Sequence, residues 1–454
     1  MKINKNSSIP PSGVRGLDFM KKILISLFLG LTFGQLHAQK TLSLRECVDL
    51  LTKNNLTYRD SRLQVESAAA QLAQTQSQRL PQLGFGAGQN LNFGRSIDRF
   101  TNSYIDEVYN TNFVGINAQV PLFQGFQIQH QVQQNTNLRD ASLKNQEAVF
   151  NQQVVRLLQG YVSVLATNAL YEAAQEQVSS SKLQVERVEK QVAAGTVGQN
   201  TLFEIKAQLA NDAFDEVTAR NNYLQARLTL FQIINVSPDD AVVFQTLPNE
   251  VFSNQRSAAL IYEEAIRTFP EIKSGQLRLQ SFDSQLKAVR AANLPSLNLS
   301  SSFGAFYTSS NPEPSYFKQL DGTRNGSLSL GLYIPIMGQW QTRPRVAATK
   351  VQQRLSANQL DITKQQLRQN IDQNSLLLSA TADRFRAAQS QTESLQANFG
   401  AAESRLNAGT VSVFEYTLAK ANLARAQANL IRARYEYALQ QRIIDFYEKG
   451  NWAF

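Results

Sequence analysis

The stretch Leu80-Pro81-Gln82-Leu83 occurs a second time in the other half of the chain, as Leu294-Pro295-Ser296-Leu297. Two more stretches return at the same offset in numbering: Val120-Pro121-Leu122 as Ile334-Pro335-Ile336, and Ala194-Gly195-Thr196-Val197 as Ala408-Gly409-Thr410-Val411. No net insertion or deletion separates these matches. The chain is therefore an internal duplication, and we expect one structural unit in residues 39–257 and a second in residues 258–454.

Residues 1–38 have the features of an upstream extension followed by a signal peptide. Lys21 and Lys22 precede the short apolar stretch Ile23–Phe33, and Leu36-His37-Ala38 offers a small-residue cleavage site. We expect the mature chain to begin at Gln39 and to leave the cytoplasm. Beyond that point no run of 18 apolar residues occurs, so the sequence predicts no membrane-spanning helix.

Composition argues against several classes of function. The net charge of +9 falls to +5 when the five basic residues and one acidic residue of positions 1–38 are removed. The basic residues are dispersed among acidic ones, which argues against a nucleic-acid partner. Cys47 is the only cysteine, and His130 is the only histidine after position 38. We therefore expect no enzyme, no zinc cluster or other metal site, and no cofactor.

Apolar and polar residues alternate in four stretches, which predicts four β-strands at about residues 81–93, 112–123, 295–307 and 326–337. The polar positions hold Gly, Asn, Ser and Gln without any charge, which suits a water-filled interior. A soluble β-sandwich could alternate in the same way. The strands are nevertheless about long enough to cross a bilayer at a tilt. Long polar loops join the strands of each pair, which implies exposure or function.

The rest of the chain reads as helix. Phe126–Ala194 and Trp340–Ala408 each hold 69 residues and could each extend about 100 Å. Their apolar stripes are narrow, and small residues permit close helix packing on two sides. An extended soluble coiled coil would show the same pattern.

Four strands cannot close on themselves, and free sheet edges are not tolerated in lipid. Two copies would give an eight-stranded barrel, and side chains would largely fill its interior. Three copies would give twelve strands and an aqueous lumen. If the strands lie in a membrane, the physics favours a homotrimer whose long helices continue the tube.

The order and doubling of these motifs resemble the TolC family of outer-membrane efflux proteins, also called outer membrane factors. The resemblance rests on the Leu-Pro-x-Leu strand starts, Val-Pro-Leu-Phe-Gln-Gly at 120–125, the Ala-Gly-Thr-Val stretches and the helix at 416–427, and it covers about residues 41–447. It implies an α+β membrane protein: a trimeric twelve-strand barrel, four strands per chain, continued by a long α-helical barrel in the periplasm of a Gram-negative bacterium. It also implies a periplasmic adaptor and an inner-membrane pump of the RND, ABC or MFS class.

The resemblance also implies site residues. The family's adaptor-docking tips map to Gly195, Thr196, Val197, Gly409, Thr410 and Val411, where the alternative is a glycine that only ends a helix. The resemblance also gives candidates for the periplasmic aperture. Glu415 is an acidic residue six positions after Gly409, and Glu204 is an acidic residue in the first repeat. Arg405 and Tyr416 are neighbours of the second tip. An ordinary exposed helix glutamate is the rival interpretation of Glu415.

These observations predict the outer-membrane channel of a tripartite efflux or type I secretion system, a passive duct in contact with outer-membrane lipid. The main alternative is a non-conducting periplasmic coiled-coil scaffold. An adaptor would need only one helical hairpin and no paired strands. The exported substrate cannot be read from the sequence.

Overall fold

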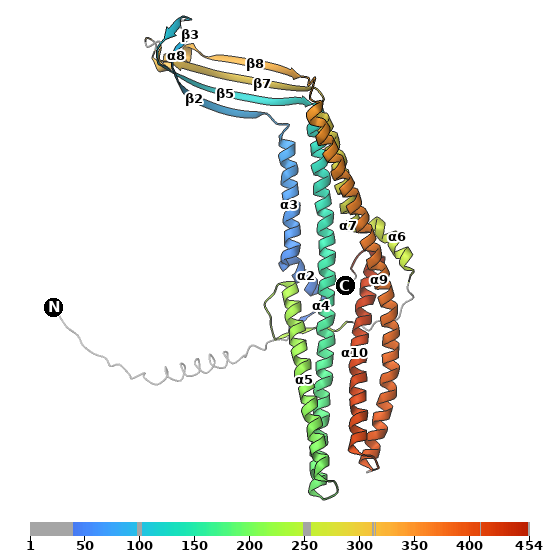
Figure 1. The fold of residues 1–454 in the computed structure, drawn as a ribbon. Helices are drawn as coiled ribbons and strands as arrows, with labels where there is room; N and C mark the ends of the chain where they lie inside the picture. The colour runs from blue at the N-terminus through green and yellow to red at the C-terminus, as the bar shows by residue number, and fades with distance from the viewer. Residues whose placement is uncertain are drawn as a thin grey trace, which may run out of the picture.

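The computed structural model describes residues 40–97, 102–247, 256–310, 313, 315–408 and 410–452. The predicted leader, residues 1–38, lies outside the described residues, as does Gly409. The molecule is elongated, with a sheet at one end and long helices running away from it (Figure 1). Within the described residues, no helix combines the length and apolar character needed to cross a membrane.

The two halves share six elements in the same order. The first half contains α2 (Leu44–Asn54), α3 (Leu56–Ser77), β2 (Gln82–Asn92), β5 (Tyr109–Gln124), α4 (Gln127–Ala193) and α5 (Gln199–Ile234). The second contains α6 (Ala258–Thr268), α7 (Pro270–Ala291), β7 (Ser296–Thr308), β8 (Asn325–Tyr333), α9 (Gln339–Asn407) and α10 (Val413–Lys449). The starts of α2, α3, β2 and α5 precede those of α6, α7, β7 and α10 by one constant interval, the same one that separates the repeated motifs. This agreement confirms the predicted duplication.

Local sequence signals explain where the helices begin. Ser43 and Glu46 form a capping box at α2: the Glu46 N–H donates to Ser43 Oγ at 3.3 Å, and the Ser43 N–H donates to Glu46 Oε2 at 2.8 Å. Asn55 caps α3 by accepting the Tyr58 N–H at 2.9 Å. At the equivalent place in the second half, Pro270 occupies the first position of α7, where its missing N–H costs nothing.

The sheet has the order β2-β5-β7-β8 with every neighbouring pair antiparallel. Phe85, Ile116 and Phe303 lie side by side on one face, and all three are exposed. On the opposite face the hydroxyls of Ser302 and Ser327 are 2.8 Å apart. Four antiparallel strands per chain are thus confirmed. Strands β2 and β8 form the two edges of the sheet.

Strand β8 ends at Tyr333, four residues before the predicted end at residue 337. The register places Tyr333 opposite Ser296, so Ile334 would face Pro295. Proline has no N–H to donate, and Pro335 follows immediately, so the ladder cannot continue. By contrast, β5 extends past Pro121 to Gln124 because a bulge between Pro121 and Phe123 restores its pairing with β7.

The loops between paired strands contain structure that the sequence did not predict. The first contains a short hairpin of β3 (Arg95–Ile97) and β4 (Tyr104–Asp106), with the Arg95 guanidinium 4.9 Å from the Tyr104 ring centre. The second contains α8 (Tyr316–Gly322). Its Gln319 Oε1 accepts the Thr308 N–H at 3.0 Å. Helix α8 therefore supplies a partner for one N–H of the β7 edge beyond Gly304, where pairing with β8 stops.

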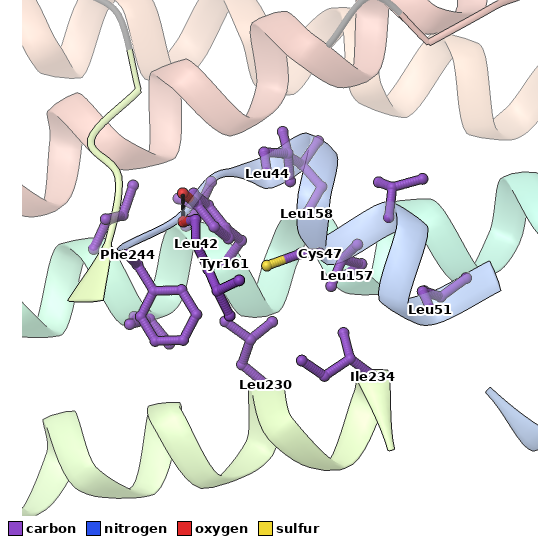
Figure 2. Close-up of a cluster of buried hydrophobic side chains, with 14 of the residues drawn as sticks. Leu42, Leu44, Cys47, Leu51, Leu157, Leu158, Tyr161, Leu230, Ile234 and Phe244 are labelled. Carbon is purple, nitrogen blue, oxygen red and sulfur yellow. Dashed lines mark hydrogen bonds between the residues drawn. The ribbon is translucent and has the colours of Figure 1, made fainter. Parts of the chain in front are cut away.

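A hydrophobic core holds the middle of the molecule together (Figure 2). There, β1 (Lys40–Leu42) pairs in parallel with β6 (Val242–Phe244). The hydroxyl oxygen of the buried Tyr161 on α4 lies 3.1 Å from the carbonyl oxygen of Leu42 in β1 and 2.6 Å from that of Gln245, the residue after β6, so its one hydrogen can be donated to either. Cys47 is fully buried in this cluster, and burial raises the pKa of its thiol to about 12. Cys47 is therefore a packing residue rather than a nucleophile.

Candidate functional site

The turn between α4 and α5 lies at the end of the molecule away from the sheet (Figure 1). Gly195 has a φ of +72°, in the left-handed region that favours glycine. Its N–H donates to the Val192 carbonyl at 2.9 Å, and the Thr196 N–H donates to the Gln191 carbonyl at 3.0 Å. These two bonds make a Schellman motif, which satisfies carbonyls that the helix end leaves unpaired.

Thr196 adds a third bond to this turn, because its hydroxyl donates to the same Gln191 carbonyl at 2.9 Å. The second tip repeats the arrangement: the Thr410 N–H and hydroxyl donate to the Arg405 carbonyl at 3.0 and 3.1 Å. Both threonines are exposed, whereas Val197 and Val411 are half-buried. Each described part of Gly-Thr-Val therefore ends a helix and presents an exposed, hydrogen-bonded turn to solvent.

The candidate aperture residues occupy different environments. Glu415 is exposed in the first turn of α10, where its N–H donates to Ser412 Oγ at 3.3 Å. Glu204 is exposed on α5. Arg405 is exposed, and its Nε donates to the Ala401 carbonyl of its own helix at 3.4 Å. The carboxylates of both glutamates can therefore interact with ions in solution.

Tyr416 points into the helix bundle instead. Its side chain is 3% exposed and its ring lies 5.6 Å from that of Phe399. Burial raises the pKa of Tyr416, and the nearby Glu403 carboxylate raises it further. Among the described contacts, none joins Tyr416 to Arg405, so the single chain does not assemble these two residues into a network.

A buried ionic cluster joins the two repeats above the tips. Lys420 on α10 is 4% exposed, Asp212 on α5 is 5% exposed, and Ser181 on α4 is 2% exposed. The Lys420 ammonium donates to Ser181 Oγ at 2.6 Å and lies 3.7 Å from Asp212 Oδ2. The Ser181 hydroxyl donates to that same oxygen, and Gln208 Nε2 donates to Asp212 Oδ1 at 2.8 Å.

This cluster is a specific contact rather than general packing. Burial lowers the pKa of Lys420, and the Asp212 charge opposes that shift. A buried charge is stable only with a partner and satisfied hydrogen bonds, so the two hairpins fit together in one alignment. In the first repeat the equivalent lysine, Lys206, makes an exposed ion pair with Glu189 at 2.8 Å.

Sequence reasoning missed this cluster. Its one signal is that Lys420 lies between Tyr416 and Leu423, in the apolar stripe of α10. A lysine at such a position needs a partner. The partner's identity depends on packing between helices of different repeats, far apart in the chain, as the contact of Lys420 with Ser181 shows. Periodicity cannot supply that information.

The fold is that of known outer-membrane channels. A crystal structure of CusC superposes with a TM-score of 0.76 at 19% identity, covering 90% of this chain and 92% of that one. The CmeC outer membrane channel of Campylobacter jejuni gives 0.73 at 20% identity, covering 90% and 85%. The outer membrane protein TolC of Salmonella enteritidis is 22% identical over 441 residues, which cover 94% of this chain and 86% of that protein.

Residues 47–236 and 261–445 both match the family described as "Outer membrane efflux protein". The chain belongs to this family. It is an outer-membrane efflux channel of a Gram-negative bacterium, its long helices extend into the periplasm, and it is a transport protein rather than an enzyme. The TolC-like fold predicted from the repeated motifs is confirmed.

Removing the carboxylate of the ionic cluster should loosen the contact between the hairpins. In Asp212→Ala the buried Lys420 ammonium loses its carboxylate, which should cost about 3–5 kcal/mol. Hydrogen exchange of the α10 amides around residue 420 would measure the loss. The matched control is Glu189→Ala, which breaks the exposed pair of Lys206 and should cost at most about 1 kcal/mol. Equal effects in the two variants would contradict a specific role for the buried cluster.

Proposed function

We propose that the chain works as a homotrimer, a passive export duct that receives cargo from an inner-membrane pump through a periplasmic adaptor. The observation that carries the trimer is the four-stranded sheet with edges at β2 and β8. Backbone groups at such edges cannot remain unpaired in lipid. Three copies give twelve strands, enough to enclose a water-filled lumen, and the family consists of trimeric outer-membrane channels.

The order of the helices supports the same closure. Near the sheet, α3 packs on α4, α4 on α7, and α7 on α9. The duplication makes the α7–α9 contact equivalent to the α3–α4 contact. The α4–α7 contact has no such equivalent within one chain. Its equivalent would join α9 to α3 of the next copy, and repetition of that contact closes a ring.

Side chains on α9 fit this missing contact. Ala141 on α4 is 1% exposed and its carbonyl accepts the Ser274 hydroxyl of α7 at 2.8 Å. The equivalent position on α9 is Leu355, which is 56% exposed, and its neighbour Val351 is 53% exposed. Helix α5 also presents an apolar row, with Phe214 at 72% and Val217 at 57% exposed. We infer that neighbouring copies cover these rows.

Charge on the α9 row should prevent trimer formation. Val351→Lys and Leu355→Lys together place two ammonium groups in the inferred contact, where burial without partners is unfavourable. The mass of the detergent-extracted complex should fall from trimer to monomer. The single change Gln352→Lys, about 80° around the helix from the middle of this row, should disturb the trimer less. A wild-type monomer that conducts ions in planar bilayers would refute the proposed assembly.

The two tips are the proposed adaptor-docking sites: Gly195, Thr196, Val197, Thr410 and Val411, together with Gly409 outside the described residues. Their support is that Thr196 and Thr410 make the same two hydrogen bonds to the preceding helix, so a docking partner would meet an exposed threonine at the same place in each repeat. Exposed turns held by internal hydrogen bonds suit recognition because they have less freedom to lose on binding.

Photo-crosslinkers at Thr196 and Thr410 should capture the adaptor in cells, whereas a crosslinker at the exposed Glu176, about 26 Å further up α4, should not. Gly195→Leu should reduce export while the trimer persists. A Cβ at residue 195 meets no atom within 4 Å, so the cost is the left-handed backbone alone, about 1–2 kcal/mol. Crosslinkers at both threonines that never capture an adaptor would exclude this docking site.

We further propose that Glu415 lines the closed periplasmic entrance. In a trimer, three copies of this exposed carboxylate would approach one axis and attract cations. Glu415→Ala should therefore weaken cation preference and block by divalent ions in single-channel recordings. Glu204→Ala is the comparison, because its offset from the first tip differs by three residues. Unchanged conductance, selectivity and block in Glu415→Ala would leave Glu415 as a solvent-exposed residue of the first helical turn.

A further inference from the structure

The helix ends nearest the sheet carry basic side chains without acidic ones. Five of these side chains, called the basic belt from here on, lie within about 9 Å of a helix end along the axis. They are Arg79 just after α3, Lys287 and Arg290 near the end of α7, and Arg343 and Arg345 near the start of α9. All five are exposed.

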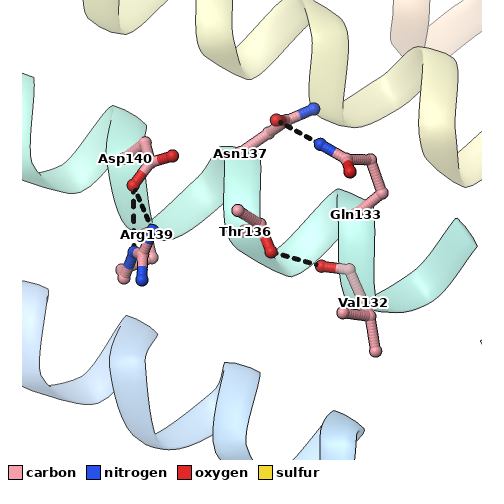
Figure 3. Close-up of polar contacts among 6 residues, drawn as sticks. All are labelled: Val132, Gln133, Thr136, Asn137, Arg139 and Asp140. Atoms are coloured by element: carbon pink, nitrogen blue, oxygen red, sulfur yellow. Dashed lines mark hydrogen bonds and ion pairs between the residues drawn. The ribbon is translucent and has the colours of Figure 1, made fainter. Parts of the chain in front are cut away.

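Acidic residues are absent from a much longer zone. None occurs in residues 67–94, 108–138, 284–312 or 325–360, which include all four strands of the sheet and the adjoining helix ends. On α4 the first acidic residue is Asp140, which forms an ion pair with the adjacent Arg139, with 2.7 Å between the guanidinium nitrogen and Asp140 Oδ1 (Figure 3). On α7 the acid nearest the sheet is Asp283, whose Oδ1 accepts a hydrogen bond from Gln353 Nε2. Of the five belt residues, only Lys287 has an acidic residue one turn away on its own helix, namely Asp283.

Exposed apolar side chains lie at the same level as the basic belt. Ile336 and Met337, in the connection from β8 to α9, are 89% and 77% exposed, and Trp340, in the first turn of α9, is 76% exposed. In the first repeat Phe126 takes the position of Trp340 and is 54% exposed. Arg343 lies one turn after Trp340, on the same side of α9. Tryptophan next to basic residues is typical of the boundary between a bilayer and water.

We propose that the basic belt binds the phosphate groups of anionic glycerophospholipids in the periplasmic leaflet of the outer membrane. The inference rests on the outer-membrane location and on the helices extending into the periplasm. With this orientation the uncharged sheet occupies the hydrocarbon layer, and the basic belt meets the headgroups directly below it. Guanidinium groups suit this role because they bind phosphate oxygens in pairs.

The test compares two pairs of arginine and lysine substitutions with equal charge changes. Arg290→Gln with Arg343→Gln removes two members of the basic belt. Lys350→Gln with Arg354→Gln, the control, removes two exposed basic residues about 10–16 Å further down α9 from Arg343. Native mass spectrometry of the full-length complex would count retained phosphatidylglycerol against phosphatidylcholine. We expect about fivefold weaker retention of phosphatidylglycerol for each belt charge removed, and no change in the control.

Three results would overturn the proposal. Equal losses in the two pairs would show a long-range effect of net charge. Equal retention of phosphatidylcholine and phosphatidylglycerol by the wild type would exclude headgroup recognition. Changed ion selectivity of the reconstituted channel, with lipid retention intact, would place the basic belt in the lumen. Arg343→Lys keeps the charge but not the paired geometry, so it should retain more phosphatidylglycerol than Arg343→Gln, which separates loss of binding from a folding defect.

Discussion

Backbone hydrogen bonding at the edges of one sheet is the constraint on which this structure depends. Strands β2 and β8 each have a neighbour on one side only, and lipid offers no partner for the N–H and C=O groups on the other side. Other copies of the chain must supply those partners. The same copies would cover the exposed rows of α9 and α5, so pairing of strands and packing of helices are two parts of one closure.

Much of the fold was predictable because the duplication repeats weak signals in one register. Alternation over residues 295–307 would be ambiguous alone, but it is matched at the equivalent place in the first half, and in both halves a second alternating stretch and then a long helix follow. The short elements were not predictable. Helix α8 and the β3–β4 hairpin have no counterparts among the residues that the structure describes, and the β1–β6 pairing joins strands of three residues that are far apart in sequence.

The tips and the ionic cluster differ in how far the sequence could predict them. Gly-Thr-Val is a local signal, since one glycine with positive φ and one threonine complete the turn within six residues. The contact of Lys420 with Asp212 depends on how two helical hairpins pack. Position along α10 indicates that Lys420 is buried, but only the packed structure identifies its carboxylate. The end of β8 also required the register, because Pro295 limits it from the opposite strand.

The duplication has left two equivalent lysines with different partners. Lys420 reaches Asp212 in the interior, whereas Lys206 pairs with Glu189 at the surface. The position equivalent to Asp212 in the second repeat is Ala426, so the carboxylate is present in one half only. In a ring of three such chains, the six repeats would have similar backbones, but the buried carboxylate would occur only three times. The two halves are therefore no longer interchangeable, and the order of the repeats along the chain determines where each buried ion pair forms.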